Sequence, residues 1–214
     1  MELFDTHAHF DAEEFDGDRD QVLQGLGERG VRLVVNPGCD LPSSQKAVDL
    51  AQPSPFLYAA VGIHPEECGG YDGSWLEAIR TLASEPKVVA IGEIGLDYYW
   101  EENPPREKQQ QVFRDQLALA RELDLPVIVH DREAHGDSLA IVKEFPEVRG
   151  VFHCYSGSVE MARELLDLGS FFWQDDIYII SSKITFYIAD IAFCHIFFQI
   201  QTDLPFQLLR GWLL

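Results

Sequence analysis

The stretch Met1-Glu2-Leu3-Phe4-Asp5-Thr6-His7-Ala8-His9-Phe10 opens the chain and sets a pattern that later segments repeat. Residues 3–6 are predicted to form a short strand, and two histidines follow directly at its end. Side chains two residues apart in an extended backbone point to the same side, so the imidazoles of His7 and His9 can converge on one cation. Two solvated histidines near a terminus would give the same short motif by chance. Further metal-binding residues later in the chain would favour the first interpretation.

Apolar runs, several of them rich in Val and Ile, recur up to about residue 169, and amphipathic segments of helical length separate them. The runs predict strands at residues 3–6, 31–36, 56–62, 87–92, 126–129 and 150–152. The segments between predict helices at residues 18–29, 74–84, 106–123, 138–145 and 159–168. Strands that alternate with helices indicate a parallel α/β sheet. So many repeats, without a glycine-rich dinucleotide motif after the first strand, favour a TIM-type (β/α) barrel over an open doubly wound sheet.

The character of the chain changes in residues 170–214, where Lys183 and Arg210 are the only Lys or Arg residues. A seventh strand at 176–181 and an eighth at 196–201 are possible, but no length is left for a helix to cover the eighth. The apolar run 184–200 contains an Asp and a His, so we expect it to be buried rather than to span a membrane. We therefore expect one domain over residues 1–214, well specified over 1–169 and incomplete or altered at its C-terminal end.

Charge and cysteine usage restrict the function classes. The formal net charge of −20 argues against a basic surface that tracks a nucleic-acid backbone. It leaves room for a phosphate-bearing substrate, because bound divalent cations let an acidic site hold an anion. The four cysteines are scattered without a C-x-x-C pair, which indicates reduced thiols and a cytoplasmic protein. The N-terminus lacks the pattern of a signal peptide, and nothing in the sequence indicates an obligate protein partner.

A histidine or a glutamate also follows each later predicted strand, except the second strand at residues 31–36. His64 follows the third strand, Glu93 the fourth, His130 the fifth and His153 the sixth. In a parallel barrel these ends open on one face, which is where barrel enzymes carry their chemistry. Any one of these histidines alone would more often be structural, but the joint arrangement predicts a metal centre. Histidines with a carboxylate suit divalent cations such as Zn²⁺, Mn²⁺ or Mg²⁺.

The segments around these residues resemble the successive motifs of the TatD family of metal-dependent deoxyribonucleases. The motifs are Asp5-Thr6-His7-Ala8-His9-Phe10-Asp11, Val61-Gly62-Ile63-His64-Pro65, Gly92-Glu93-Ile94-Gly95-Leu96-Asp97-Tyr98, Leu125-Pro126-Val127-Ile128-Val129-His130-Asp131-Arg132 and His153-Cys154-Tyr155-Ser156-Gly157. The resemblance covers residues 1 to about 169. It implies a TIM-type barrel of the amidohydrolase kind with two divalent metal ions per chain.

The resemblance also implies a role for each motif residue. His7 and His9 would bind one metal, Glu93 would bridge both, and His130 and His153 would bind the second. His64 would hold the substrate phosphate, with Arg132 a weaker candidate for the same role.

The family's last ligand, an Asp that also acts as general base, matches Asp203 in Gln201-Thr202-Asp203-Leu204-Pro205, although Gln201 stands where the family has Glu. Two structural alternatives stay open: Arg132 pairs only with Asp131 or Glu133, or the Asp203 segment is a plain turn.

The leading hypothesis is therefore an exonuclease-like DNase that cleaves phosphodiester bonds at DNA ends by a two-metal mechanism, with Glu93 and Asp203 at the reacting centre. A second hypothesis is hydrolysis of a small amide, ester or lactone, because the same barrel supports those reactions. A third is a catalytically impaired variant with a defective C-terminus.

Overall fold

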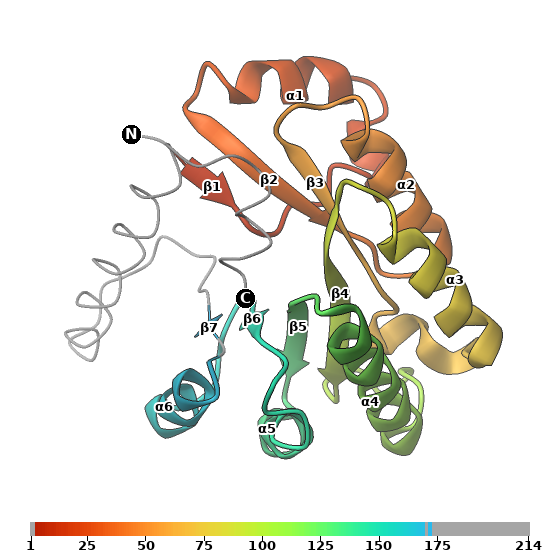
Figure 1. Ribbon diagram of the computed structural model, residues 1–214, viewed down its shortest axis with the longest axis vertical. Helices are drawn as coiled ribbons and strands as arrows, with labels where there is room; N and C mark the ends of the chain where they lie inside the picture. Colours follow the sequence, from red (N-terminus) through yellow and green to blue (C-terminus); the bar gives the residue numbers. More distant parts are fainter. Residues whose placement is uncertain (1–2, 170, 173–214) are drawn as a thin grey trace.

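The computed structural model describes residues 3–169 and 171–172 of the 214-residue chain (Figure 1). Its strands are all parallel and form one sheet in the order of the chain, from β1 to β7. The strands are β1 (Leu3–Asp5), β2 (Val31–Pro37), β3 (Leu57–Val61), β4 (Val88–Asp97), β5 (Val127–Arg132), β6 (Gly150–Phe152) and β7 (Phe171–Phe172). The helices are α1 (Arg19–Leu26), α2 (Leu41–Ala51), α3 (Gly73–Ala83), α4 (Arg106–Leu123), α5 (His135–Val142) and α6 (Val159–Asp167), with short 3-10 turns η1 (Glu13–Phe15) and η2 (Pro65–Gly70).

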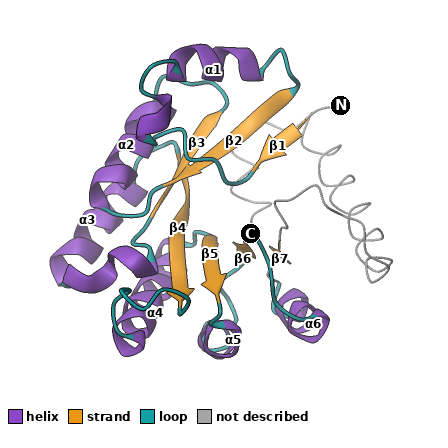
Figure 2. Cartoon of the chain, turned by 180° about the vertical axis from the view of Figure 1, so that it is seen from behind, coloured by secondary structure: helices purple, strands orange, loops and turns teal. Residues whose placement is uncertain are grey.

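The strands line the inside of an arc and the helices lie around its outside (Figures 1 and 2). Sequential parallel strands with an α-helix between each strand and the next are the arrangement of a (β/α) barrel, so the predicted α/β fold class is confirmed over the described residues. β1 and β7 are the edge strands of this described sheet. The predicted strands at 176–181 and 196–201 lie outside the described residues, and the seventh strand of the described part comes earlier, at Phe171–Phe172.

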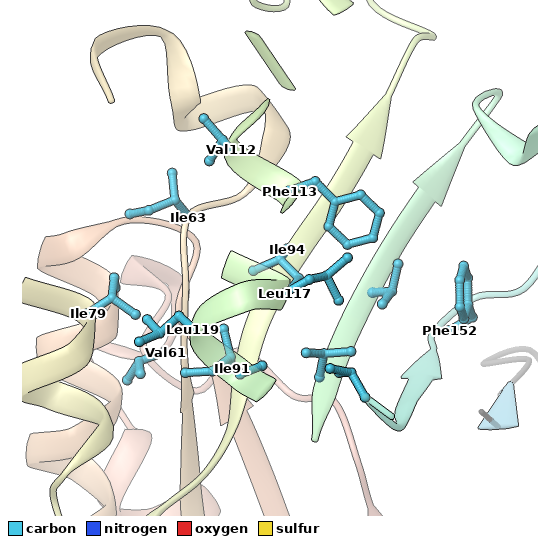
Figure 3. Packing of buried hydrophobic residues seen from close by; sticks show 14 of the residues in the cluster. Val61, Ile63, Ile79, Ile91, Ile94, Val112, Phe113, Leu117, Leu119 and Phe152 are labelled. Atoms are coloured by element: carbon cyan, nitrogen blue, oxygen red, sulfur yellow. The ribbon is translucent and has the colours of Figure 1, made fainter. Parts of the chain in front are cut away.

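Side chains alternate between two faces along each strand, because successive residues in a strand point to opposite sides. One set packs under the helices, against residues such as Phe113 of α4 (Figure 3). It includes Ile91 and Ile94 of β4, which share a face because the register of β4 shifts between them. The other set forms a separate small cluster, made of Val35, Ala60, Ala90 and Ile128. Strands buried on both faces explain why the sequence shows nearly continuous apolar runs rather than alternation.

Two strands extend further than the apolar runs indicate. β4 was predicted to stop at residue 92 but continues to Asp97, and β5 was predicted to stop at 129 but continues to Arg132. The continued parts pair with each other, with Asp97 opposite Arg132. Their Gly, Asp and Glu residues have low strand propensity, so pairing between neighbours rather than local preference sets these ends.

Helix α2 was not predicted from the sequence. Its buried side chains are small, as with Ala47 and Ala51, and give a weak periodic signal. The available signal was its start: the Asp40 carboxylate accepts the backbone N–H of Ser43 at 2.8 Å, and the Ser43 hydroxyl closes the capping box. Among the described residues, no helix combines the length and apolar character that crossing a bilayer requires.

Candidate metal centre

Strand β4 carries the residue around which the site is built. Glu93 is only 3% exposed although its side chain is a carboxylate. Two positions further on, Gly95 has φ +140° and lies opposite His130 of β5. A Cβ there would lie 2.0 Å from the His130 carbonyl oxygen, so only glycine allows the two strands this approach. The close approach brings the β5 histidine beside the β4 carboxylate.

One oxygen of Glu93 faces the two histidines that follow β1. The Nε2 atoms of His7 and His9 lie 3.2 and 3.7 Å from Glu93 Oε2. These two nitrogens are 2.9 Å apart. The expected convergence of His7 and His9 on one point is therefore present in the structure.

The other oxygen of Glu93 faces histidines from β5 and from the end of β6. His153 Nε2 lies 2.6 Å and His130 Nδ1 3.0 Å from Oε1, and the two ring nitrogens are 3.3 Å apart. His64 Nε2, after β3, lies 3.5 Å from the same oxygen. The carboxylate thus stands between two pairs of histidines, one pair on each oxygen.

The spacing of these nitrogens fits shared cations. Neighbouring ligands held at 2.0–2.1 Å from one ion stand roughly 2.8–3.4 Å apart, from octahedral to tetrahedral geometry. The separations within the two histidine pairs, 2.9 and 3.3 Å, are close to this range. The buried Nδ1 atoms of His7 and His153 have no hydrogen-bond partner among the described residues, and their Nε2 atoms face Glu93, where a cation would bind. The residues present therefore fit a divalent metal centre.

Carboxylates behind the histidines hold the rings in place. Asp97, 1% exposed, places Oδ2 3.0 Å from His130 Nε2. Asp11 Oδ1 lies 3.8 Å from His9 Nδ1 and accepts a hydrogen bond from the Asn36 amide at 2.8 Å. Such contacts fix the orientation and tautomer of a metal-binding imidazole. Sequence reasoning assigned Asp97 no role because the predicted strand ended at residue 92.

The protonation states follow from burial and from these contacts. Burial raises the pKa of Glu93, but hydrogen bonds from four histidines outweigh it and hold the pKa well below its usual range. Burial lowers the pKa of His7. For His130 the contacts with Glu93 and Asp97 outweigh burial and raise the pKa, and for His9 those with Asp11 and Glu93 do the same. The centre therefore holds an ionised carboxylate, and His9 and His130 bind a proton more tightly than His7 does.

His64 begins the 3-10 turn η2 and is 7% exposed. Its Nδ1 accepts the backbone N–H of Glu66 at 3.3 Å, so in the neutral ring the proton lies on Nε2. That N–H faces Glu93 and the interior of the centre. His64 thus presents a hydrogen-bond donor to the interior of the centre.

Three further residues bear on the centre: the structure shows new contacts for Arg132 and Cys39, and it does not describe Asp203. Arg132 is exposed and its guanidinium lies over the Tyr99 ring at 4.0 Å, and the described residues show no ion pair between it and Asp131 or Glu133. Cys39 was not predicted, yet its sulfur lies within 4.8 Å of ligand atoms of His9 and Glu93. Burial raises the pKa of the Cys39 thiol, so it stands beside the centre in its neutral form. Asp203 lies outside the described residues.

Comparisons with known proteins decide the family. A family model described as TatD related DNase matches residues 4–191 of the 214. The chain belongs to this family. A TatD-family relative from Bacillus subtilis, named an uncharacterized metal-dependent hydrolase YabD, is 42% identical over 168 residues. A relative from Klebsiella pneumoniae, named 3'-5' ssDNA/RNA exonuclease TatD, is 40% identical over 171 residues.

A solved structure of a relative agrees with the family assignment. The crystal structure of YjjV, a TatD homologue from Escherichia coli K12, matches with a TM-score of 0.73 and 35% identity over 79% of this chain and 66% of that one. The two relatives are matched over 78% and 79% of this chain, and the chain spans 66% and 65% of their lengths.

Proposed function

We propose that this TatD-family chain is a divalent-metal-dependent hydrolase that cleaves phosphodiester bonds at DNA strand ends. The observation that carries the proposal is Glu93, whose two oxygens face different pairs of histidines. That arrangement supports a bridging carboxylate between two ions. The name of the Klebsiella relative, an exonuclease, supports nucleic acid as the substrate class.

The residues divide the work in the following way. His7 and His9 would hold one ion, His130 and His153 the other, and Glu93 both. Bound there, two divalent ions polarise a phosphodiester and lower the pKa of a water molecule. Glu93 stays ionised at neutral pH and supplies the charge that retains them.

The remaining residues would act on the substrate and the water. His64 would donate Nε2–H to a phosphoryl oxygen, which stabilises charge as it grows there. Asp97 keeps the His130 ring fixed. We assign the general-base role to Asp203. The cysteines of the described part, Cys39, Cys68 and Cys154, are thiols rather than disulfides, which supports a reducing, cytoplasmic location for this reaction.

The experiment separates this function from the two alternatives. The chain is treated with a chelator, reloaded with Mg²⁺, Mn²⁺ or Zn²⁺, and offered end-labelled DNA oligonucleotides, a lactone and an aryl ester. The proposal predicts metal-dependent release of nucleotides and little hydrolysis of the small esters. Turnover of the lactone or ester alone would favour the small-molecule hydrolase. No turnover of any substrate by the metal-loaded chain would favour the impaired variant.

A further inference from the structure

Two aromatic side chains stand exposed just beyond β4. Tyr99 and Trp100 are 46% and 44% exposed, and with Leu166 they are the large hydrophobic residues that the described part leaves at its surface. Their rings form an edge-to-face pair with centroids 4.6 Å apart. The guanidinium of Arg132 lies over this pair, 4.0 Å from the Tyr99 centroid and 5.4 Å from that of Trp100. We call Tyr99, Trp100 and Arg132 the aromatic platform.

The platform is built on the same two strand ends as the metal centre. Arg132 follows His130 by two residues, and it lies opposite Asp97 in the β4–β5 register. Asp97 connects the two sites directly: its Oδ2 contacts His130 Nε2 at 3.0 Å, while its Oδ1 accepts the backbone N–H of Tyr99 at 2.9 Å. The platform is therefore held at a fixed position beside the centre.

The chemistry of the platform suits a nucleobase. Every base offers a flat π-face, and aromatic rings and guanidinium planes both stack on such faces. A guanidinium is also a local positive charge on a chain of net charge −20, so it attracts the phosphate next to the stacked base. A base inside a duplex has both faces covered by its neighbours, so this surface favours an unpaired nucleotide, whose base can turn away from its neighbours and stack on the platform.

We propose that the aromatic platform stacks the nucleobase next to the scissile phosphodiester and so selects unpaired nucleotides at a strand end. The inference rests on the proposed function, because it assumes that the bond cleaved is that of a nucleic acid. It adds the part of the substrate that is recognised and the residues that recognise it. Tyr99 and Trp100 are specificity residues here, with no part in the bond cleavage.

The kinetic test compares two oligonucleotides that differ only at the strand end, one with thymine bases and one with abasic sugars at the last two positions. Loss of one stacked base is worth about 5- to 150-fold in binding. The unsubstituted chain should therefore show a KM lower by about this factor for the base-bearing strand. Trp100→Ala should remove most of that preference and leave kcat and the abasic KM nearly unchanged, while Trp100→Phe should retain much of it.

The control is Leu166→Ala on α6, an equally exposed apolar side chain that should leave the preference intact. If the chain cleaves both strands and both Trp100→Ala and Tyr99→Ala keep the full preference for bases, the platform proposal is wrong even though the proposed function stands.

A binding measurement distinguishes failure of the platform proposal from failure of the proposed function. Oligo(dT) titrated into the metal-free chain should quench tryptophan fluorescence, and the quenching should be absent in Trp100→Phe. If the chain cleaves no phosphodiester but this Trp100-dependent quenching is present, the proposed function fails and the platform stands. Quenching that is the same in Trp100→Phe would contradict the platform.

Discussion

At the scale of single residues, the metal centre depends on a buried carboxylate that stays ionised. Removing an ionised group from water is costly unless charge and hydrogen bonds compensate it. Around Glu93 the compensation comes from histidines, at distances of 2.6 to 3.7 Å. Histidine is a good ligand as well as a good donor, so the same group that stabilises the empty carboxylate also suits a metal ion.

Asp97→Asn tests the contact behind His130. The amide keeps the shape of the carboxylate but loses the charge that orients the ring, so metal affinity should fall about 10- to 100-fold. The matched control is Asp131→Asn, because Asp131 is also a buried carboxylate paired with a histidine, His135 at 2.8 Å, without contact to Glu93. Isothermal titration with Mn²⁺ measures both, and equal losses in the two variants would contradict the assigned role of Asp97.

Metal affinity should also fall as the pH is lowered from 8 to 6. His9 and His130 have raised pKa values, so each keeps its proton to a higher pH than an ordinary histidine, and a protonated ring cannot bind metal. Protons and metal therefore compete across this range, and binding releases protons. Titrations at several pH values check the sign: affinity that is flat or that rises toward pH 6 would contradict it.

Sequence reasoning found the histidines and Glu93 because a position at a strand end is visible in the sequence itself. It missed Asp97 and Cys39, which become neighbours of the centre only through strand pairing and the turn after β2. Its expectation that Arg132 helps to hold the substrate phosphate stays a prediction, and the structure adds that the guanidinium lies over the Tyr99 ring. The local sequence gave no indication of that aromatic contact.

At the scale of elements, the pairing of β4 with β5 determines the geometry of the site. Gly95→Ala should destabilise the chain by roughly 1–3 kcal/mol or more, since the new methyl group collides with the His130 backbone at a strained φ. Gly136→Ala in α5, where a Cβ meets nothing within 4 Å, should stabilise by roughly 0.5–1 kcal/mol. Urea unfolding measures both. A Gly95 variant as stable as the parent would contradict the close approach of the two strands.

The predicted helix Arg106–Leu123 agrees with α4 because its apolar positions are large and regularly spaced. α5 begins at His135, earlier than the predicted residue 138, because Ser138 is held by a hydrogen bond to Asp131 at 3.1 Å within the first turn. Local pattern thus gives the type of an element, and contacts with neighbouring strands set its ends.

At the scale of the whole molecule, the charge of the chain opposes that of the substrate, because a chain of net charge −20 is proposed to bind a polyanion. Bound divalent cations let an acidic chain hold such a substrate, provided that the protein contacts few phosphates. For a single strand with one or two phosphate contacts, raising monovalent salt from 50 to 200 mM should weaken binding only roughly three- to sevenfold. A protein with 6–10 such contacts loses about 10³–10⁵-fold in the same range. KM for an oligonucleotide at fixed Mn²⁺ measures this, and a loss above about 100-fold would indicate an extended backbone-binding surface instead.

The alternation of strands and helices predicts the arc of the sheet, and the arc brings the strand ends together.

The metal centre is the central claim, and diffraction from crystals grown with Mn²⁺, recorded where manganese scatters anomalously, tests it most directly. We predict two anomalous peaks, both beside Glu93, with His7 and His9 at one and His130 and His153 at the other. Crystals whose manganese peaks lie elsewhere, with none beside Glu93, would contradict the account.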